Sequence, residues 1–188
     1  MTAPMLQAAL AALRGGGVVA YPTEGVWGVG CDPRNAAAVA KVIALKQRDW
    51  HKGLILLAAD FEMLRPFVTV PSAAALAQAQ ATWPGPVTWV FPAGPACLPL
   101  VRGEHPSIAV RVTAHPLAAA LSRAFGAPVV STSANLAGHP AALTAADVRA
   151  QLGSGVDAIV DGPLGGLKGP TAIRDIATGD YIRRPAGN

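Results

Sequence analysis

The apolar positions of this chain alternate between helical spacing and short continuous runs. Leu6, Leu10 and Leu13 recur at helical spacing and stop at three glycines, after which residues 18–21 form a run that predicts a buried strand. The same reasoning predicts, in chain order, a helix over 36–45 capped by Asn35, a strand over 54–58, a helix from Ser72 that ends before 83, strands over 87–91 and 107–112, a helix over 116–125 closed by Gly126, and a strand at 129–130. These elements predict an α/β fold.

The last third of the chain changes character. Thr144 and Asp147 have the spacing of a capping box and predict the start of one more helix. From residue 153 onward, short apolar runs at 158–160, 171–175 and 181–184 lie between glycine-proline turns and predict short strands. Because no repeat or linker interrupts the pattern, we expect a single domain over residues 1–188 around a mixed sheet.

Composition narrows the classes of function. The net charge is +4 although only 14% of residues are charged, so a basic cleft for a polyanion is plausible. Cys31 and Cys97 are too few for a disulfide framework and have no zinc spacing, so we expect buried thiols in a reducing compartment. The longest apolar stretch, 84–101, is interrupted by prolines, and the first residues lack a signal-peptide pattern. We therefore expect a cytoplasmic protein without membrane contact.

Candidate chemistry lies where apolar runs end. Residues 21–24, 46–48 and 131–135 are short polar or cationic segments at such junctions, which is where α/β proteins build their sites. Several cations, including Lys52 and Arg111, combined with hydroxyl and backbone donors would suit a triphosphate. The pattern indicates an anionic substrate, and a nucleotide fits best.

Each segment also has a plain structural explanation. Lys46 and Arg48 can be the solvated end of a helix, and residues 131–133 can be a cap or turn. The glycines at 15–17 precede a strand and lack the Gly-Lys-Ser/Thr ending of a phosphate loop, so we expect a helix terminator. No histidine has a partner at metal-ligand spacing, and Trp50 alone among the tryptophans lies in a polar loop where it could stack on a base. The residues alone leave both explanations open.

Six segments, in this order and spanning nearly the whole chain, resemble the short-form TsaC/YrdC threonylcarbamoyl-AMP synthases: YPTEGVWGVGCDP, ALKQRDWHKGLILLAA, WPGPVTWVFPA, SIAVRVTAHPL, PVVSTSANLAG and GPTAIRDIATG. The resemblance implies a twisted open mixed sheet flanked by helices, with a basic concave face. It implies an enzyme that makes L-threonylcarbamoyl-AMP from L-threonine, bicarbonate and ATP, with release of pyrophosphate. The product would pass to downstream threonylcarbamoyl-transfer proteins that modify position 37 of tRNA, and Mg²⁺ would arrive with ATP.

The resemblance also implies roles for individual residues. The four residues that match the family's Lys-x-Arg and Ser-x-Asn motifs are implied to be catalytic: Lys46, Arg48, Ser133 and Asn135. The implied ATP-binding residues are Lys46, Arg48, Lys52, Ser107 and Ser133. The implied threonine-binding residues are Thr23, Arg111 and Ser131, and no residue is implied as a metal ligand.

This chain departs from the family pattern at three positions. Gly25 stands where relatives often carry Thr or Ala, Trp27 where they carry Tyr or Phe, and Asp49 where proline commonly follows the Lys-x-Arg motif. An acid beside phosphate-binding cations predicts a lower ATP affinity.

Two other functions compete with the synthase. One is a double-stranded RNA or ribosomal RNA binding module that uses the basic concave face without chemistry, and weak RNA binding could also accompany the enzyme. The other, a fragment of a hydrogenase-maturation carbamoyltransferase, is disfavoured because 188 residues leave no room for its additional regions.

Overall fold

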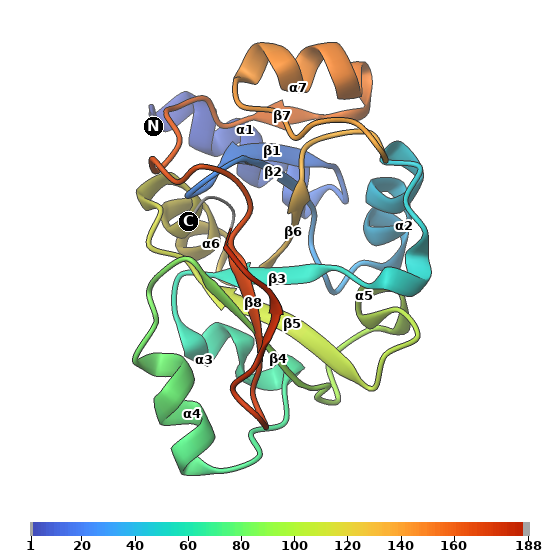
Figure 1. Ribbon diagram of the computed structural model, residues 1–188. Helices are drawn as coiled ribbons and strands as arrows, with labels where there is room; N and C mark the ends of the chain where they lie inside the picture. Colours follow the sequence, from blue (N-terminus) through green and yellow to red (C-terminus); the bar gives the residue numbers. More distant parts are fainter. Residues whose placement is uncertain (1, 186–188) are drawn as a thin grey trace.

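Within residues 2–185, which this computed structural model describes, a nine-stranded mixed sheet runs through the molecule with helices on both faces (Figure 1). In spatial order its strands are β7 (Ala158–Ile159), β1 (Val19–Pro22), β2 (Trp27–Gly30), β6 (Val129–Ser133), β3 (Ile55–Ala58), β5 (Ser107–Val112), β4 (Val87–Pro92), β8 (Ala172–Asp175) and β9 (Tyr181–Arg183). The pairs β7–β1, β3–β5 and β4–β8 are parallel and the others are antiparallel. The predicted fold class, an open mixed sheet flanked by helices, is confirmed.

The predicted helices begin and end at the local signals read from the sequence, and two single-turn helices accompany them. They are α1 (Ala3–Arg14), α2 (Ala36–Leu45), α3 (Phe61–Leu64), α4 (Ala73–Gln80), α5 (Pro99–Arg102), α6 (Pro116–Phe125) and α7 (Ala145–Leu152), with 3-10 turns η1 (Trp50–Lys52), η2 (Arg65–Phe67) and η3 (Gly153–Gly155). The Asn35 side chain accepts a hydrogen bond from Ala38 N, and Gly126 ends α6 with a left-handed φ of 77°. Thr144 and Asp147 form the predicted capping box. These predictions are confirmed because caps act within one helical turn.

Some elements were not predicted. The strand β2 contains two glycines, which have low strand propensity, and α3 and α5 are single helical turns. The strand predicted at 129–130 continues to Ser133, so residues 131–133 belong to a strand and the cap-or-turn explanation is wrong. The two cysteines are buried, as expected. Trp27 and Trp89 are buried as well, whereas Trp83, which its position beside proline also placed in the core, is half-buried.

The two faces of the sheet are covered unequally. Alternate residues such as Ala20, Val29 and Leu56 point into the larger core, which receives side chains from α2, α3, α4 and α7. The opposite face carries Val19 and Leu57, and among the described residues the helices packed against it are α1 and α6. Farther along that face, the residues of β5 and β6 are polar or small and Ile55 of β3 is half-buried, so this half of the sheet remains available for a site.

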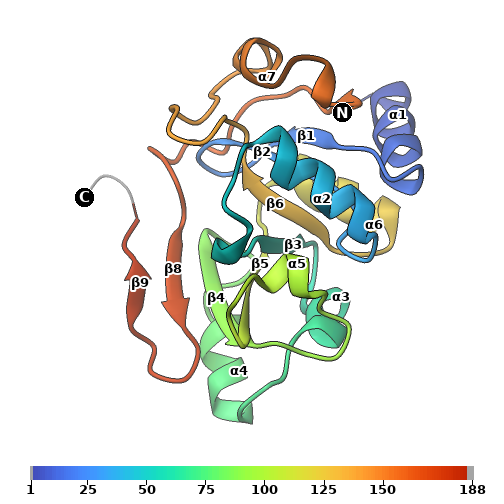
Figure 2. The ribbon, with the colours of Figure 1, turned by 90° about the vertical axis from the view of Figure 1, so that its right-hand side faces the viewer.

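The connection between β7 and β8 crosses from one edge of the sheet to the other. Residues 161–171, here called the strap, lead from β7 past the β1–β2 turn to β8 (Figure 2). Gly165 N donates to Thr23 O at 3.0 Å, and Leu167 N donates to Glu24 O at 2.9 Å. The strap thus holds the first polar segment against the β8–β9 end of the chain. In the described part of the chain, no helix combines the length and apolarity needed to cross a membrane.

Candidate functional site

A cavity of about 220 Å³ opens on the uncovered half of the sheet. Four cations from separate parts of the chain line it: Arg48, Lys52, Arg111 and Arg183. Hydroxyl groups line it as well: Thr23, Ser131, Thr132, Ser133 and Thr171. Among the described residues, no aspartate or glutamate is part of this lining. The cavity is therefore cationic and rich in hydrogen-bond donors, which suits an anion.

The serines of β6 lie on the sheet face that carries the cavity. Ser131 and Ser133 are two residues apart in β6, so their side chains point to the same side. Ser131 pairs with Ile55 of β3, and Ser133 pairs with Gly28 of β2. The register thus brings the hydroxyls of β6 beside the turn after β1, where Thr23 Oγ1 donates to Val26 O at 2.7 Å.

Arg48 and Lys52 reach the cavity because the chain turns sharply after α2. Gln47 has a left-handed φ of 51° and follows Lys46, the C-cap of α2. Arg48 Nη2 donates to Gly53 O at 2.9 Å, and its buried Nε has no partner among the described residues. Burial lowers the pKa of Arg48, since the charged form loses solvation. An anionic partner would compensate for the solvation that the guanidinium loses on burial.

Asp49 has a local structural role. Its carboxylate accepts from His51 N at 3.1 Å and lies 2.6 Å from His51 Nδ1, and so caps η1, which carries Lys52. Hydrogen bonds from His51 lower the pKa of Asp49. Trp50 is 40% exposed beside these residues and its ring lies against that of His51, with centroids 4.3 Å apart. The effect of Asp49 on ATP affinity stays a prediction.

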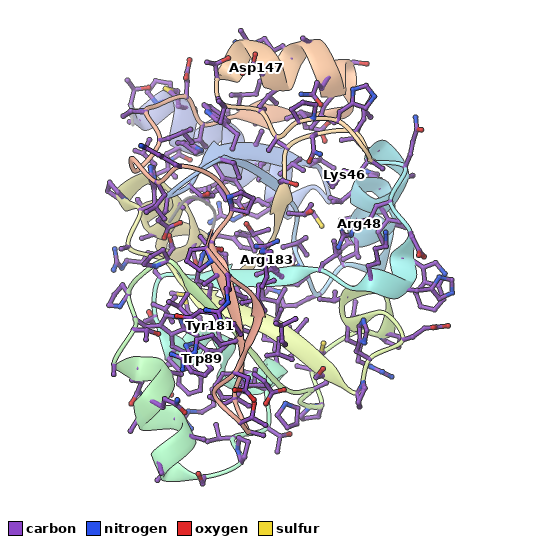
Figure 3. All side chains as sticks on the ribbon, viewed as in Figure 1. Lys46, Arg48, Trp89, Asp147, Tyr181 and Arg183 are labelled. Carbon is purple, nitrogen blue, oxygen red and sulfur yellow. The ribbon has the colours of Figure 1, made fainter. Side chains whose placement is uncertain are left out.

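Lys46 lies behind the cavity and is not part of its lining. Its buried Nζ donates to Ser133 O, to Asn135 O at 2.7 Å and to Asn135 Oδ1 at 3.1 Å. Asn135 Oδ1 also accepts from Ser133 Oγ at 2.6 Å. The two predicted motifs therefore meet, and Figure 3 shows Lys46 and Arg48 together near the end of α2. In this arrangement Lys46 and Asn135 fix the end of β6, while Arg48 and Ser133 line the cavity.

Arg111 is almost fully buried and forms an internal ion pair with Glu24. Its Nη2 lies 3.2 Å from Glu24 Oε2, and its Nη1 donates to Thr171 Oγ1 at 2.7 Å. Arg111 still lines the cavity, and its Nε has no partner among the described residues. Arg111 can therefore form its ion pair with Glu24 and still contact a ligand in the cavity.

Ser107 is not part of the cavity lining. It stands at the start of β5, four residues before Arg111, on the same side of the strand as Ala109 and Arg111. Ala109 lines the cavity, so Ser107 extends this row beyond its edge. A ligand longer than the cavity could reach it.

Thr171 and Arg183 line the cavity and were not among the predicted site residues. Thr171 is the last residue of the strap, and Arg183 in β9 donates to Thr171 O through Nε at 3.1 Å and Nη2 at 2.8 Å. Burial lowers the pKa of Arg183, and Arg111 lowers it further. Figure 3 shows Arg183 turned toward β3 in the centre of the molecule. The only sequence signal for these residues was the GPTAIRD segment, which contains Thr171.

Gly25, one of the departures from the family pattern, permits a close backbone contact. A Cβ at this position would lie 1.9 Å from Gly169 O and 3.3 Å from Leu167 Cβ. A methyl group cannot fit at such a distance from a backbone oxygen. Glycine at position 25 is therefore required for the strap to lie where it does.

Comparisons with known proteins agree with the fold and show the family. Residues 11–184 match the model of the Sua5, YciO and YrdC family, whose description is "Telomere recombination". The threonylcarbamoyl-AMP synthase of Chromohalobacter salexigens is 52% identical over 183 residues, which cover 97% of this chain and 98% of that protein. The threonylcarbamoyl-AMP synthase of Stenotrophomonas maltophilia is 52% identical over 95% of this chain and 97% of that protein.

Solved structures also match. The crystal structure of P. abyssi Sua5 complexed with L-threonine has a TM-score of 0.88 and 28% identity over 94% of this chain, which corresponds to 52% of the Sua5 chain. Crystalline E. coli YciO has a TM-score of 0.86 and 25% identity over 98% of this chain and 91% of that protein. Since the family model covers most of the sequence and relatives near 50% identity align end to end, this chain belongs to the Sua5/YciO/YrdC family.

Proposed function

We propose that this protein is a threonylcarbamoyl-AMP synthase, which joins L-threonine, bicarbonate and ATP into L-threonylcarbamoyl-AMP and releases pyrophosphate. Relatives that carry this name align over almost the full length of the chain at 52% identity. The observation that carries the proposal is the cavity itself, where four cations and a set of hydroxyls converge without a carboxylate in the lining of the described chain. Such a lining suits a reaction whose substrates are all anionic or zwitterionic.

The polyphosphate of ATP is assigned to the end of the cavity near Arg48 and Lys52. Both are cations without a carboxylate partner within salt-bridge distance in the described chain. Arg48 keeps a free Nε, and an arginine fork suits phosphate oxygens. Ser133 and, beyond the cavity edge, Ser107 are proposed to donate to the nucleotide. Lys46 and Asn135 are assigned to the same function through the position of Ser133.

Threonine is assigned to the end of the cavity near Arg111. The guanidinium is held from two sides, and its buried Nε lacks a hydrogen-bond partner among the described residues, so a carboxylate beside it would supply the missing acceptor. The hydroxyls of Thr23 and Ser131 lie on the same side of the sheet and are proposed to contact the amino acid. The crystallised Sua5 relative was solved with L-threonine, which supports this substrate.

The chemistry needs positioning more than covalent catalysis. The threonine amine adds to bicarbonate with loss of water, which gives an N-carboxylate. One oxygen of this carboxylate attacks the α-phosphorus of ATP, the bond between the α-phosphorus and its bridging oxygen breaks, and pyrophosphate leaves. Arg48, Lys52 and Arg183 are proposed to hold the anions together and to stabilise charge on the departing pyrophosphate.

Magnesium is proposed to enter as part of the ATP substrate. The hydroxyl and cationic groups of the lining donate hydrogen bonds, whereas Mg²⁺ prefers carboxylate oxygens, so these residues do not form a protein-held magnesium site. No step of the proposed mechanism is therefore assigned to a residue-bound ion.

The product would be passed to transfer proteins that attach the threonylcarbamoyl group to position 37 of tRNA. This role implies the cytoplasm, where ATP, free threonine and tRNA occur together. The competing RNA-binding function is not favoured, because the relatives at 52% identity are named as enzymes.

The test is to incubate the protein with ATP, threonine and labelled bicarbonate, and to look for a labelled adenylate together with pyrophosphate. Formation of both only when threonine and bicarbonate are present supports the proposal. Pyrophosphate release that does not depend on bicarbonate contradicts it.

A further inference from the structure

Glu24 is a buried carboxylate that contacts Arg111, a residue of the cavity lining. It follows β1 and lines a second cavity of about 560 Å³ on the side of α6, not the cationic cavity. Its Oε1 accepts from Thr113 Oγ1 at 2.7 Å and from Ala114 N at 3.1 Å. These two donors belong to the turn between β5 and α6, so the carboxylate is fixed to the scaffold at one oxygen.

The other oxygen of Glu24 faces Arg111. Oε2 lies 3.2 Å from Arg111 Nη2, close enough for an ion pair although not aligned as a hydrogen bond. Arg111 Nη1 is held by Thr171 Oγ1 on its other side. A guanidinium is planar, so contacts at both Nη atoms fix its orientation as well as its position. The buried Nε has no partner among the described residues, and its direction is fixed together with that of the guanidinium.

We propose that Glu24 is a positioning residue for Arg111, acting through the relay Thr113–Glu24–Arg111, and that it determines how tightly the site binds the carboxylate of its amino-acid substrate. This inference rests on the proposed function and deepens it. Glu24 does not touch the substrate, because it lies outside the cationic cavity.

The charge of Glu24 also distinguishes Arg111 from the other cations of the cavity. Arg111 is neutralised by a carboxylate, whereas Arg48, Lys52 and Arg183 have no carboxylate within salt-bridge distance in the described residues. A compensated cation attracts a triphosphate less than free cations do, yet it can still donate hydrogen bonds to a single carboxylate.

The first variant is Glu24→Gln. The amide oxygen can still accept from Thr113 and Ala114, while its NH₂ group faces the N–H groups of Arg111, so shape is kept and the ion pair is lost. We expect the dissociation constant and KM for threonine to rise about tenfold to a hundredfold, the range for loss of a hydrogen bond to a charged group. The KM for ATP should change less than threefold.

The second pair of variants tests the relay. Thr113→Val removes the hydroxyl that holds Glu24, and we expect a smaller rise in the threonine dissociation constant, whereas Thr113→Ser keeps the hydroxyl and should restore binding. In an Arg111→Lys background, Glu24→Gln should add little, because both changes remove the same oriented guanidinium. Glu62→Gln, which breaks an exposed ion pair with Arg65, is the matched control and should leave threonine binding unchanged.

Threonine binding is measured by calorimetry, separately from turnover. If Glu24→Gln lowers the melting temperature but binds threonine like the wild type, Glu24 is merely structural and the inference is wrong. Additive effects of Glu24→Gln and Arg111→Lys would also overturn it. If the wild type binds threonine but forms no adenylate, the proposed function fails, while weaker binding by Glu24→Gln would still support the role of Glu24.

Discussion

Gly25→Ala tests whether the strap is part of the site. The added Cβ would lie 1.9 Å from Gly169 O, a backbone atom that cannot rotate away. To reach an ordinary contact, the strap would have to move by about 1 to 1.5 Å. That movement would strain the hydrogen bonds from Gly165 N to Thr23 O and from Leu167 N to Glu24 O. It would also pull Thr171, the last residue of the strap, away from Arg111.

The size of the effect follows from these contacts. Two weakened backbone hydrogen bonds correspond to about 2 kcal/mol, which agrees with about 1–3 kcal/mol for inserting a methyl group into a packed region. For a chain of this length, about 1 kcal/mol shifts the melting temperature by about 2–4 °C, so we expect a decrease of about 4–8 °C. Because Arg111 loses an anchor, the KM for threonine should rise about tenfold while the KM for ATP changes little.

The assay combines thermal denaturation followed by circular dichroism with pyrophosphate release at varied threonine and saturating ATP. Gly126→Ala is the control, since Gly126 has a φ of 77° and nothing within 4 Å of its Cβ position. It should lower stability by about 1–2 kcal/mol through backbone strain and leave the threonine KM unchanged. A Gly25→Ala variant with wild-type melting temperature and threonine KM would refute the reasoning, as would an equal rise of KM in Gly126→Ala.

Further predictions concern three cations of the site region and the binding of RNA. Arg48→Ala should lower turnover about tenfold to a thousandfold with little change in melting temperature, as expected for loss of a charge-stabilising donor, and a wild-type rate would remove Arg48 from the mechanism. Arg111→Lys should raise the threonine KM more than the ATP KM, because the ammonium keeps the charge and loses the fork; equal effects would place Arg111 elsewhere. Burial, and secondarily Arg48, lowers the pKa of Lys46 from 10.5 to about 8. A neutral amine has too few donors for its three oxygen contacts, so activity should fall as pH rises through about 8, which a pH–rate profile measures. Between about pH 8 and 10.5 the unfolded state retains the Lys46 proton that the folded state has lost, so this group's contribution to unfolding free energy should rise with pH. Denaturant titrations of wild type and Lys46→Met at pH 7 and 9 measure it, and an equal pH dependence in both would contradict the shift. Finally, RNA binding should be weak, lost with excess ATP and steeply dependent on salt, with a slope of roughly 0.7 to 0.9 per phosphate contact in log affinity; tight binding that survives ATP would favour the RNA module.

The sequence alone determined the elements whose signals are local. The end of α1 at Gly15, the Asn35 cap of α2, the left-handed Gly126 after α6 and the capping box of α7 all depend on residues within one turn. Motif order also identified the family, because six segments matched over nearly the whole chain. Short elements such as β2 and α5 were missed, since they contain too few residues to establish a period.

Only the tertiary structure decided which residues meet. Lys46 and Asn135 are 89 positions apart, and nothing local indicates that the ammonium contacts the carbonyls of Ser133 and Asn135 instead of lining the cavity. Backbone oxygens have no sequence signature, so such partners cannot be read from residue types. The same holds for the contact between Gly25 and Gly169 O, which explains the missing side chain at position 25.

The C-terminal segment illustrates the physical reason most clearly. Strands β8 and β9 follow β7 along the chain, but β8 pairs with β4, on the opposite side of the sheet. This order depends on which edges remain free after the other strands have paired. Thr171 and Arg183 therefore join Arg111 through sheet topology, a property of the whole chain that no local pattern of apolar and polar residues encodes.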